Sequence, residues 1–402
     1  MKILIYHWKA YNYIDIIETF RQMGHEVNVF KYPLEHYDDD PVFARLLAEK
    51  LDEAEYDFVF TVNYFAVISE VCQEKGRKYV VWTCDNPLIS MYHQAVFYPC
   101  NYFFTFDKTN YYEFRQMGVK QIWHLPLTAN AHRIQAILQQ FPAAESSGTD
   151  IGSTGGGSAN EYKHDITFVG SLYERNTYDK IEHRLPEYLR GYLEGTIQAQ
   201  MNISGGNIIG KMLTPDIMAQ LETYFTLEKS EKSFSNLNLI FGTTVLGFKV
   251  AAEQRIELLN MLSKKHRVSV YSNSNLSCLP FCEACGSADY WTKLPQVFVE
   301  SKINLNLTIP NIKSGIPLRV WDVLASGGFL MTNYQVEILD YFEPDRDLVI
   351  FESPEELEKK VSYYLEHEEE REQIARNGKE KLVRYHPYNG RLQKMLSTVF
   401  EK

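Results

Sequence analysis

The chain has 402 residues, which is too many for one ordinary hydrophobic core, so we expect two or three domains. Its 41 Lys and Arg against 52 Asp and Glu give a net charge of −11, which argues against nucleic acid or an anionic membrane surface as partner. Six cysteines form no disulfide framework, and no apolar run or leader pattern indicates a membrane span or signal peptide, so we expect a cytoplasmic protein.

Strand and helix patterns alternate through the first third of the chain. Short apolar runs predict strands at residues 2–6, 26–32, 58–62, 79–83, 102–106 and 122–125. Helical patterns between them end at Gly24, Gly76 and Gly118. The pentapeptide Phe-Arg-Gln-Met-Gly occurs at 20–24 and 114–118, which indicates two helices with the same kind of end. This alternation predicts a doubly wound parallel sheet, in which ligands bind beyond the carboxyl ends of the strands.

A new α/β pattern follows a polar segment. Residues 145–160 hold five Gly and four Ser, which is typical of a flexible linker or a long surface loop. We therefore predict an N-terminal domain over residues 1–144 and a C-terminal domain over 161–385, with a helical insertion around 181–235. Expected strands in the second domain are residues 165–171, 268–271, 303–307 and 329–332, and a last helix lies within 386–402.

The segment 313–322 has the pattern of an anion site. A turn at Gly315 leads into a helix N-terminus, where free N–H groups and the helix dipole favour anions. Arg319 in the first turn can pair with phosphate oxygens, and Asp322 lies on the same side, where a carboxylate can accept ribose hydroxyls. A surface Arg–Asp pair is the alternative. Gly170-Ser171 follows a predicted strand, where these small residues either let the backbone approach a phosphate or form an ordinary turn.

Polar residues also follow predicted strands in the first half. Asp85 ends a buried strand, where a carboxylate is costly unless it is paired or faces a cleft, so we interpret it as functional. His7 is a competing candidate base. Asp107 also follows a predicted strand and is either functional, by the same argument as Asp85, or the cap of the next helix. The triplet Asp38–Asp40 is interpreted as a turn or N-cap rather than a metal-nucleotide site.

Three cysteines have a spacing that needs separate consideration. Cys278, Cys282 and Cys285 show the C-x3-C-x2-C pattern that holds an iron–sulfur cluster in radical-SAM enzymes. Only 117 residues follow Cys285, too few for the barrel of such enzymes, and no further ligand follows at zinc-site spacing. We favour a loop with free thiols and expect no metal.

The sequence resembles the CgeB-like group 1 glycosyltransferases over most of its length. The resemblance is carried by SKINLNL at 301–307, SGIPLRVWDVLASGGFL at 314–330, SPEEL at 353–357 and HPYNGR at 386–391. In the first half, Trp82-x-x-Asp85-x-Pro87 and Leu125-Pro126-Leu127 are similar to that family's N-terminal domain. The resemblance implies a GT-B fold, with two Rossmann-like α/β domains facing a central cleft and a last helix that crosses back to the first domain.

The resemblance also implies an activity. The implied activity is that of a glycosyltransferase, which moves a sugar from a nucleotide-sugar donor to a hydroxyl of a glycan, protein or small molecule. Bacterial cell-surface or protein glycosylation is an example. GT-B enzymes need no catalytic metal, so no cofactor is expected. A non-catalytic sugar-nucleotide or glycan-binding partner protein is the first alternative, and a radical-SAM enzyme is the second.

The resemblance assigns roles to individual residues. Gly315 and Ile316 present N–H groups to the donor phosphates, Arg319 neutralises the leaving diphosphate, and Asp322 holds the ribose. Ser314 stands where related retaining enzymes have Glu, so the stereochemistry stays open. Asp85 would deprotonate the acceptor in an inverting mechanism, with His7 as competitor. Further expected donor contacts are Gly170, Ser171, Tyr271, Ser272, Asn304 and Asn306.

Overall fold

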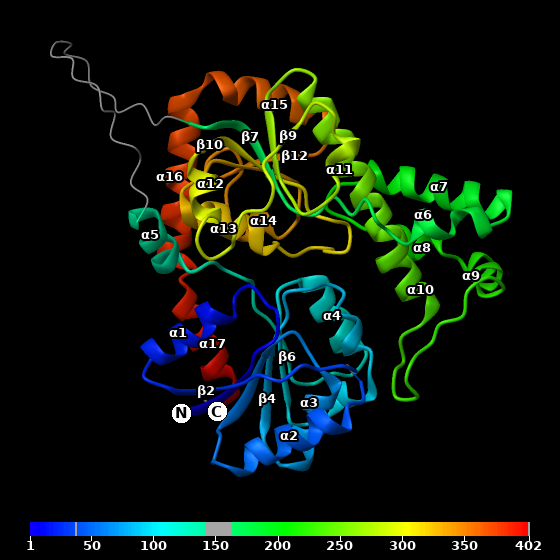
Figure 1. Ribbon diagram of the computed structural model, residues 1–402, viewed down its shortest axis with the longest axis vertical. Helices are drawn as coiled ribbons and strands as arrows, with labels where there is room; N and C mark the ends of the chain where they lie inside the picture. Colours follow the sequence, from blue (N-terminus) through cyan, green and yellow to red (C-terminus); the bar gives the residue numbers. More distant parts are fainter. Residues whose placement is uncertain (37, 141–161, 401–402) are drawn as a thin grey trace.

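The computed structural model describes residues 1–36, 38–140 and 162–400. They form two lobes, each built on a six-stranded parallel sheet (Figure 1). We call them the N-terminal lobe and the C-terminal lobe, after the order of their sheets in the chain. The expected linker at 145–160 lies outside the described residues.

The first sheet has the order β2-β1-β3-β4-β5-β6, with every neighbouring pair parallel. Successive residues of its strands enter two different hydrophobic cores: Ile3 and Ile5 pack with helix α1, whereas Leu4 packs with α2 and α3. A sheet buried on both faces needs apolar residues at consecutive positions, which explains the continuous apolar runs. The elements are β1 (Lys2–Tyr6), α1 (Tyr13–Gln22), β2 (Glu26–Phe30), α2 (Pro41–Asp52), β3 (Phe58–Val62), α3 (Ala66–Glu74), β4 (Lys78–Trp82), β5 (Asn101–Thr105), α4 (Lys108–Gln116) and β6 (Ile122–His124).

The second sheet has the order β12-β11-β10-β7-β8-β9 and is also entirely parallel. The crossover from β7 to β8 contains the helical insertion, and the chain then returns to the other side of β7 through β10. Its elements are β7 (His164–Val169), α11 (Phe248–Ser263), β8 (Val268–Tyr271), β9 (Glu283–Ala284), α12 (Leu294–Val299), β10 (Ser301–Asn306), α13 (Leu318–Ser326), β11 (Leu330–Asn333), α14 (Ile338–Tyr341), β12 (Val349–Phe351), α15 (Pro354–Glu366) and α16 (Glu368–Tyr385).

The helical insertion forms a small core of its own beside the second sheet (Figure 1). A π-helical stretch, Phe241–Gly247, joins its last helix to α11. The segment before that helix reaches the N-terminal lobe, where the Phe234 N–H donates to the Tyr92 carbonyl and Lys232 pairs with Glu70 at 2.6 Å. Its helices are α6 (Tyr178–Ile181), α7 (Glu187–Met201), α8 (Ile209–Met212), α9 (Pro215–Glu222) and α10 (Leu237–Ile240).

The helix ends follow the sequence signals closely. Gly24 and Gly118, which end the two copies of the pentapeptide, have φ of +85° and +102°, and both sites have open space for a Cβ. The glycines are therefore required by backbone conformation and not by a close neighbour. Asp40 caps α2 through the Phe43 N–H, which confirms the N-cap interpretation. Asn12 directly precedes α1, where an Asn can cap a helix, but its side chain donates to Cys84 Sγ instead.

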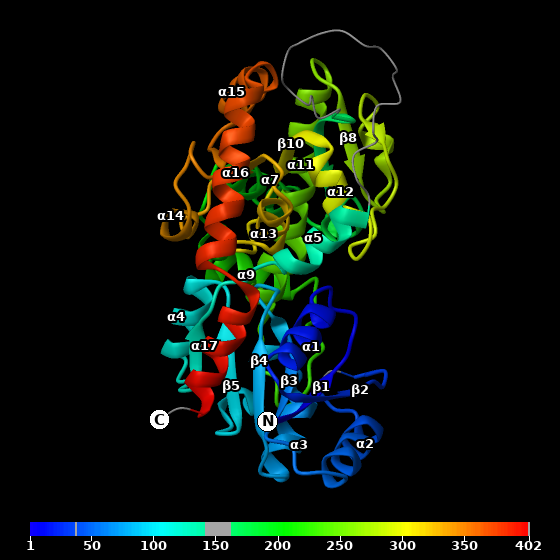
Figure 2. The same ribbon diagram turned by 90° about the vertical axis from the view of Figure 1, so that its left-hand side faces the viewer.

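Two helices connect the lobes. Helix α5 (Ala131–Gln140) follows the first sheet and packs against α12 and α13 of the C-terminal lobe. Helix α17 (Tyr388–Phe400) follows α16 down to the N-terminal lobe (Figure 2), where it packs on α1 and the Phe400 ring lies 5.5 Å from the Phe58 ring. Among the described residues, no helix combines the length and apolar character needed to cross a membrane.

Candidate functional site

A cavity of about 780 Å³ lies at the carboxyl ends of β7 and β8, beside the N-terminus of α13. We call it the strand-end cavity. Its position is where ligands bind in open parallel sheets. The structure brings six of the expected donor contacts to its wall: Gly170, Ser171, Tyr271, Ser272, Arg319 and Asp322. They come from three segments, at residues 170–171, 271–272 and 319–322, that are far apart in the chain and that sequence spacing alone does not connect.

Asp322, which is buried, and Arg319, which is partly exposed, form an ion pair in the wall of this cavity. Arg319 Nη1 lies 3.4 Å from Asp322 Oδ2, and the Tyr290 hydroxyl donates to Asp322 Oδ1 at 3.0 Å. Burial raises the pKa of the Asp322 carboxyl to about 6, although Arg319 and Tyr290 both oppose that rise. The carboxylate therefore gains from any further hydroxyl donors that a ligand brings.

The N-terminal lobe contributes aromatic and cationic groups to the same place. Tyr11 lines the cavity, and its ring lies 5.4 Å from the ring of Tyr290. Arg133 on α5 lies over the rings of Tyr290 and Trp291 and pairs with Asp15 at 2.7 Å. The cavity wall is thus completed by side chains of both lobes.

Four expected donor contacts lie elsewhere. Asn304 and Asn306 are buried within the second sheet, and their amides donate to neighbouring protein groups: Asn304 to the Phe298 and Phe329 carbonyls, Asn306 to two threonine hydroxyls. Gly315 and Ile316 are buried at the contact between the lobes. None of these four residues is among the described residues that line the strand-end cavity.

The N–H groups before α13 are occupied by a carboxylate of the other lobe. Asp107 Oδ2 accepts from the backbone N–H groups of Lys313, Ser314 and Gly315 at 2.9, 2.9 and 3.1 Å. Asp107 is fully buried and also caps α4 through the Asn110 N–H. The turn at 313–315 is therefore an anion site, as its sequence indicates, but in this structure Asp107 is the anion.

A second buried carboxylate joins this contact. The Ser314 hydroxyl lies 2.9 Å from Asp107 Oδ1 and 2.7 Å from Glu337 Oε1, and it donates its single proton to one of them. Glu337 also accepts from the Lys108 N–H and lies 2.8 Å from His124 Nε2. Ser314, at the position where the resemblance implies Glu, thus connects two carboxylates across the lobes.

Asp85 lies after β4 and is exposed to solvent. Asn63 Nδ2 donates to Asp85 Oδ2 at 2.6 Å, and Asn63 Oδ1 accepts from the Cys84 N–H at 2.8 Å. Asn63 is held at φ of 61°, an unusual conformation for a non-glycine residue. Crowding by protein atoms raises the pKa of Asp85, and the bond from Asn63 opposes that rise. A raised pKa strengthens a carboxylate as a base.

His7, the other candidate base, is half-buried after β1. Its ring centroid lies 3.6 Å from that of Tyr13. Burial lowers its pKa, and the charge of Lys31 lowers it further, so the imidazole is neutral at pH 7. His7 and Asp85 are both absent from the described lining of the strand-end cavity.

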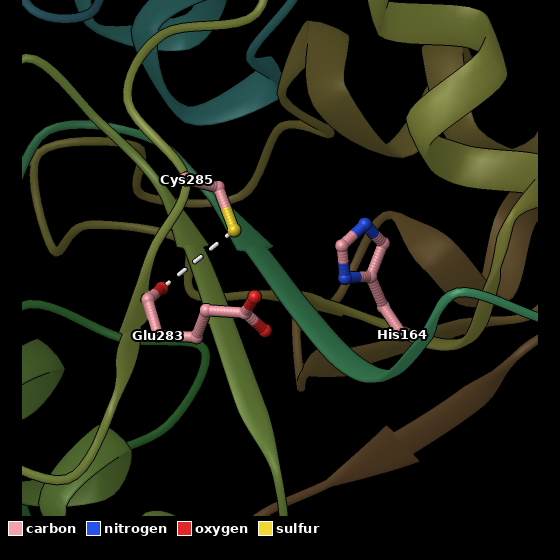
Figure 3. A group of neighbouring side chains, drawn as sticks. All are labelled: His164, Glu283 and Cys285. Carbon is pink, nitrogen blue, oxygen red and sulfur yellow. Dashed lines mark hydrogen bonds between the residues drawn. The ribbon is translucent and has the colours of Figure 1, made fainter.

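One group of three potential metal ligands is present in the described ranges: His164, Glu283 and Cys285 (Figure 3). The Ser269 hydroxyl lies 2.8 Å from His164 Nδ1 and donates to Glu283 at 2.9 Å. The other ring nitrogen of His164 lies 3.0 Å from the Tyr271 hydroxyl. Both ring nitrogens therefore have partners within the chain, and the group carries no argument for a metal ion.

The three spaced cysteines face different surroundings. Cys278 and Cys282 pack at the edge of the core under the second sheet, whereas Cys285 lies beside Glu283. Burial raises the pKa of each of these thiols, which disfavours the thiolate that a cluster needs. These surroundings fit a loop with free thiols.

Sequence reasoning did not identify Tyr173, Tyr290 and Arg255. Tyr173 and Tyr290 line the cavity, and Tyr173 has φ of 55°. Arg255 lies behind the wall, where its Nη1 donates to the Ser171 carbonyl. Nothing in a tyrosine or a mid-helix arginine taken from one sequence distinguishes these residues from ordinary surface or core positions.

Comparisons with known proteins agree with this geometry. Residues 255–397 match the family model described as glycosyl transferase-like. Among solved structures, HepE from Anabaena in complex with UDP is similar, with 11% identity, a TM-score of 0.53 and 99% of each chain covered. WaaG, a glycosyltransferase involved in lipopolysaccharide biosynthesis, has 9% identity, a TM-score of 0.52 and full coverage of both chains.

Sucrose-phosphate synthase from Thermosynechococcus elongatus is similar as well, with 10% identity, a TM-score of 0.51, and coverage of 98% of this chain and 97% of that one. No curated protein matches the sequence. Similarity at such low identity establishes the fold, which is GT-B, as expected. The family model matches residues 255–397, which lie in the second half of the C-terminal lobe and in helix α17.

Proposed function

We propose that the chain transfers a sugar from a nucleoside-diphosphate sugar, bound in the strand-end cavity, to a hydroxyl group of an acceptor. The observation that carries this proposal is the gathering of Gly170-Ser171, Tyr271-Ser272 and the Arg319–Asp322 pair around one cavity of about 780 Å³. That volume suits a nucleotide-sugar. UDP is the first donor nucleotide to test, because HepE binds UDP and UDP-glucose.

The ribose and the diphosphate of the donor each have a partner in the cavity. Asp322 accepts the ribose hydroxyls, and its raised pKa shows how poorly its charge is compensated in the free protein. Arg319, half-buried beside it, stabilises the negative charge that develops on the leaving diphosphate. The positive charge of Arg319 takes the role that a metal ion has in other enzymes, so we propose a metal-independent reaction.

Asp85 is the proposed base for the acceptor hydroxyl. It is open to solvent at the carboxyl end of β4, and Asn63 fixes its orientation. A carboxylate with a raised pKa removes a hydroxyl proton more readily than an ordinary one. Removal of that proton as the acceptor oxygen attacks the sugar belongs to an inverting mechanism.

The proposal also includes a subfamily, an acceptor class and a location in the cell. Membership of the CgeB-like subgroup is supported by the motifs at 301–330, 353–357 and 386–391. A glycan or protein acceptor, as in bacterial cell-surface or protein glycosylation, fits a cavity with an open mouth. A cytoplasmic location is supported by six free cysteines, which suit a reducing compartment.

A thermal-shift panel of nucleotides and nucleotide-sugars tests the proposal. A ligand at 100 times its Kd adds about 2.7 kcal/mol to the free energy of unfolding. We expect stabilisation by a nucleoside diphosphate and its sugar, and release of that diphosphate on turnover. If no nucleotide stabilises the protein, the proposal is wrong; binding without transfer or hydrolysis would instead indicate a sugar-nucleotide-binding partner.

A further inference from the structure

Tyr290 holds one of the two carboxylate oxygens of Asp322. It lies in the loop between β9 and α12, and its hydroxyl donates to Asp322 Oδ1 at 3.0 Å. The other oxygen, Oδ2, lies 3.4 Å from Arg319 Nη1 on α13. Each oxygen of this carboxylate thus has a donor from a different element, and the two donors together fix the plane of the carboxyl group.

The ring of Tyr290 is held in turn by residues from other parts of the chain. The guanidinium carbon of Arg133 on α5 lies 5.1 Å from the centre of the ring, which is a cation–π distance. Arg133 pairs with Asp15 of α1 at 2.7 Å, and both side chains are almost completely buried. The Tyr11 ring lies 5.4 Å away, and Tyr290 itself is buried. The ring therefore has little room to turn away from Asp322.

This arrangement leaves acceptor capacity at Asp322. An ionised carboxylate can accept about four hydrogen bonds. Within the described ranges, the side chains that donate to it are those of Tyr290 and Arg319. Asp322 and Tyr290 both line the strand-end cavity, so the remaining lone pairs are available to a ligand there. Their directions depend on the orientation that Tyr290 imposes on the carboxyl group.

Packing alone does not account for the hydroxyl of Tyr290. The ring belongs to the hydrophobic core that contains residues of both lobes, and a phenylalanine would fill that space equally well. The hydroxyl is directed at a carboxylate in the wall of a cavity and not at a backbone carbonyl, which would be the ordinary partner of a buried tyrosine. The contact thus points to the function of that carboxylate.

We infer that Tyr290 is a positioning residue for the donor ribose: its hydroxyl fixes the Asp322 carboxylate in the orientation that accepts the ribose hydroxyls, and Arg133 fixes the ring of Tyr290. This inference rests on the proposed function, because it assumes that Asp322 binds a ribose. Since Arg133 pairs with α1, the grip on the ribose depends on a contact with the N-terminal lobe.

The same contacts predict a pH dependence of donor binding. Burial raises the pKa of Asp322 to about 6, Arg319, Tyr290 and Arg133 oppose that rise, and the charge of Asp15 adds to it. An ionised carboxylate accepts hydroxyl groups more strongly than a neutral one, so donor affinity should increase as the pH rises through about 6. Tyr290→Phe removes a donor that favours the charged form, so this increase should occur at a higher pH in the variant.

Calorimetry on the full chain with UDP-glucose and its 2′,3′-dideoxyribose analogue tests the inference. Neither ligand has a group that titrates near pH 6, so the pH profile reports the protein. At about pH 8, the Kd for UDP-glucose should rise about fivefold or more in Tyr290→Phe, because a hydrogen bond to a charged group is lost. The Kd for the analogue should not change, because it has no ribose hydroxyls to lose.

A second substitution tests the part of Arg133. Arg133→Lys keeps a positive charge for Asp15 but loses the flat guanidinium that lies over the Tyr290 ring. It should raise the Kd for UDP-glucose less than Tyr290→Phe does. In the Tyr290→Phe background it should have no further effect on the ribose preference, because Arg133 acts through Tyr290. Additive effects would overturn this part of the inference.

Tyr79 on β4 offers a matched control. It is also buried, and its hydroxyl lies 2.8 Å from the Thr61 hydroxyl and accepts from the Phe65 N–H, but it is absent from the described lining of the strand-end cavity. Tyr79→Phe should lower the Tm and leave both Kd values and the pH profile unchanged. This control separates the loss of a buried tyrosine hydroxyl from the loss of ribose recognition.

The outcomes are distinguishable. If Tyr290→Phe leaves the Kd for UDP-glucose and the pH profile unchanged, the inference is wrong and the proposed function stands. An equal loss of affinity for the two ligands together with a lower Tm also overturns it, because a structural tyrosine would give that pattern. If the parent binds the two ligands equally well, Asp322 does not hold the ribose, and that assignment and the inference are both wrong. If the parent binds neither ligand, the proposed UDP donor is wrong and the inference with it.

Discussion

Asp107→Ala removes the N-cap bond of α4 and up to four hydrogen bonds between the lobes. In the parent, this carboxylate accepts from the N–H groups of Asn110, Lys313, Ser314 and Gly315 and lies within bonding distance of the Ser314 hydroxyl. Loss of the helix cap costs about 1 kcal/mol. Three buried N–H groups that lose their acceptor cost roughly 1 kcal/mol each. The expected loss of stability is therefore about 4 kcal/mol.

A domain of this size should then unfold about 8 °C lower or more, which calorimetry measures directly. Asp40→Ala is the matched control, because Asp40 is a buried N-cap that accepts from two N–H groups within the N-terminal lobe only. Asp40→Ala should therefore lower the free energy of unfolding by a few kcal/mol less than Asp107→Ala does. Equal destabilisation by the two substitutions would refute the reasoning, since the carboxylate in the 313–315 turn would then contribute nothing beyond a cap. Separation of one unfolding transition into two is a further expected sign of uncoupled lobes.

Three further substitutions test the site and its supports. Gly315→Ala places a Cβ 2.9 Å from the Phe106 carbonyl and should destabilise the chain by about 1–3 kcal/mol in urea unfolding. Gly191→Ala in α7, which has open space around it, should be neutral or stabilising. Equal effects of the two substitutions would contradict the close contact at Gly315. Burial raises the Asp322 pKa to about 6 from 3.8, so the free energy of unfolding should fall by up to about 3 kcal/mol as the pH rises from about 4 to above 6. Asp322→Asn should reduce that fall. Parallel pH profiles of the parent and the variant would disprove this expectation. Asp85→Asn should lower kcat about a hundredfold or more with donor affinity intact, and unchanged turnover would exclude Asp85 as the base.

Local sequence patterns predicted most elements because their causes are local. A strand buried on both faces must be apolar at consecutive positions, as β3 is, and a helix end that needs positive φ selects glycine, as at Gly24 and Gly118. The π-helical stretch 241–247 and the helix α5 were not predicted. The signals for α5 are nevertheless present in the sequence, because Asn130 accepts from the Arg133 N–H at its start, and Ile134 and Ile137 share its buried face.

That several expected residues line one cavity has a similar local cause. Residues at the carboxyl ends of strands share one edge of a parallel sheet, so Ser171, Tyr271 and the start of α13 could be placed together from strand order alone. Asn304 and Asn306 lie on a strand of the same sheet but are buried within it, because neighbouring strand ends and helix α12 provide acceptors for their amides.

The sequence by itself determined the α/β class, the two sheets and the anion-binding character of the turn at 313–315, because each depends on residues close together in the chain. Only the tertiary structure decided which anion that turn holds. Asp107 lies about two hundred residues earlier, and the packing of the lobes places its carboxylate against three N–H groups that a free helix start would offer to phosphate.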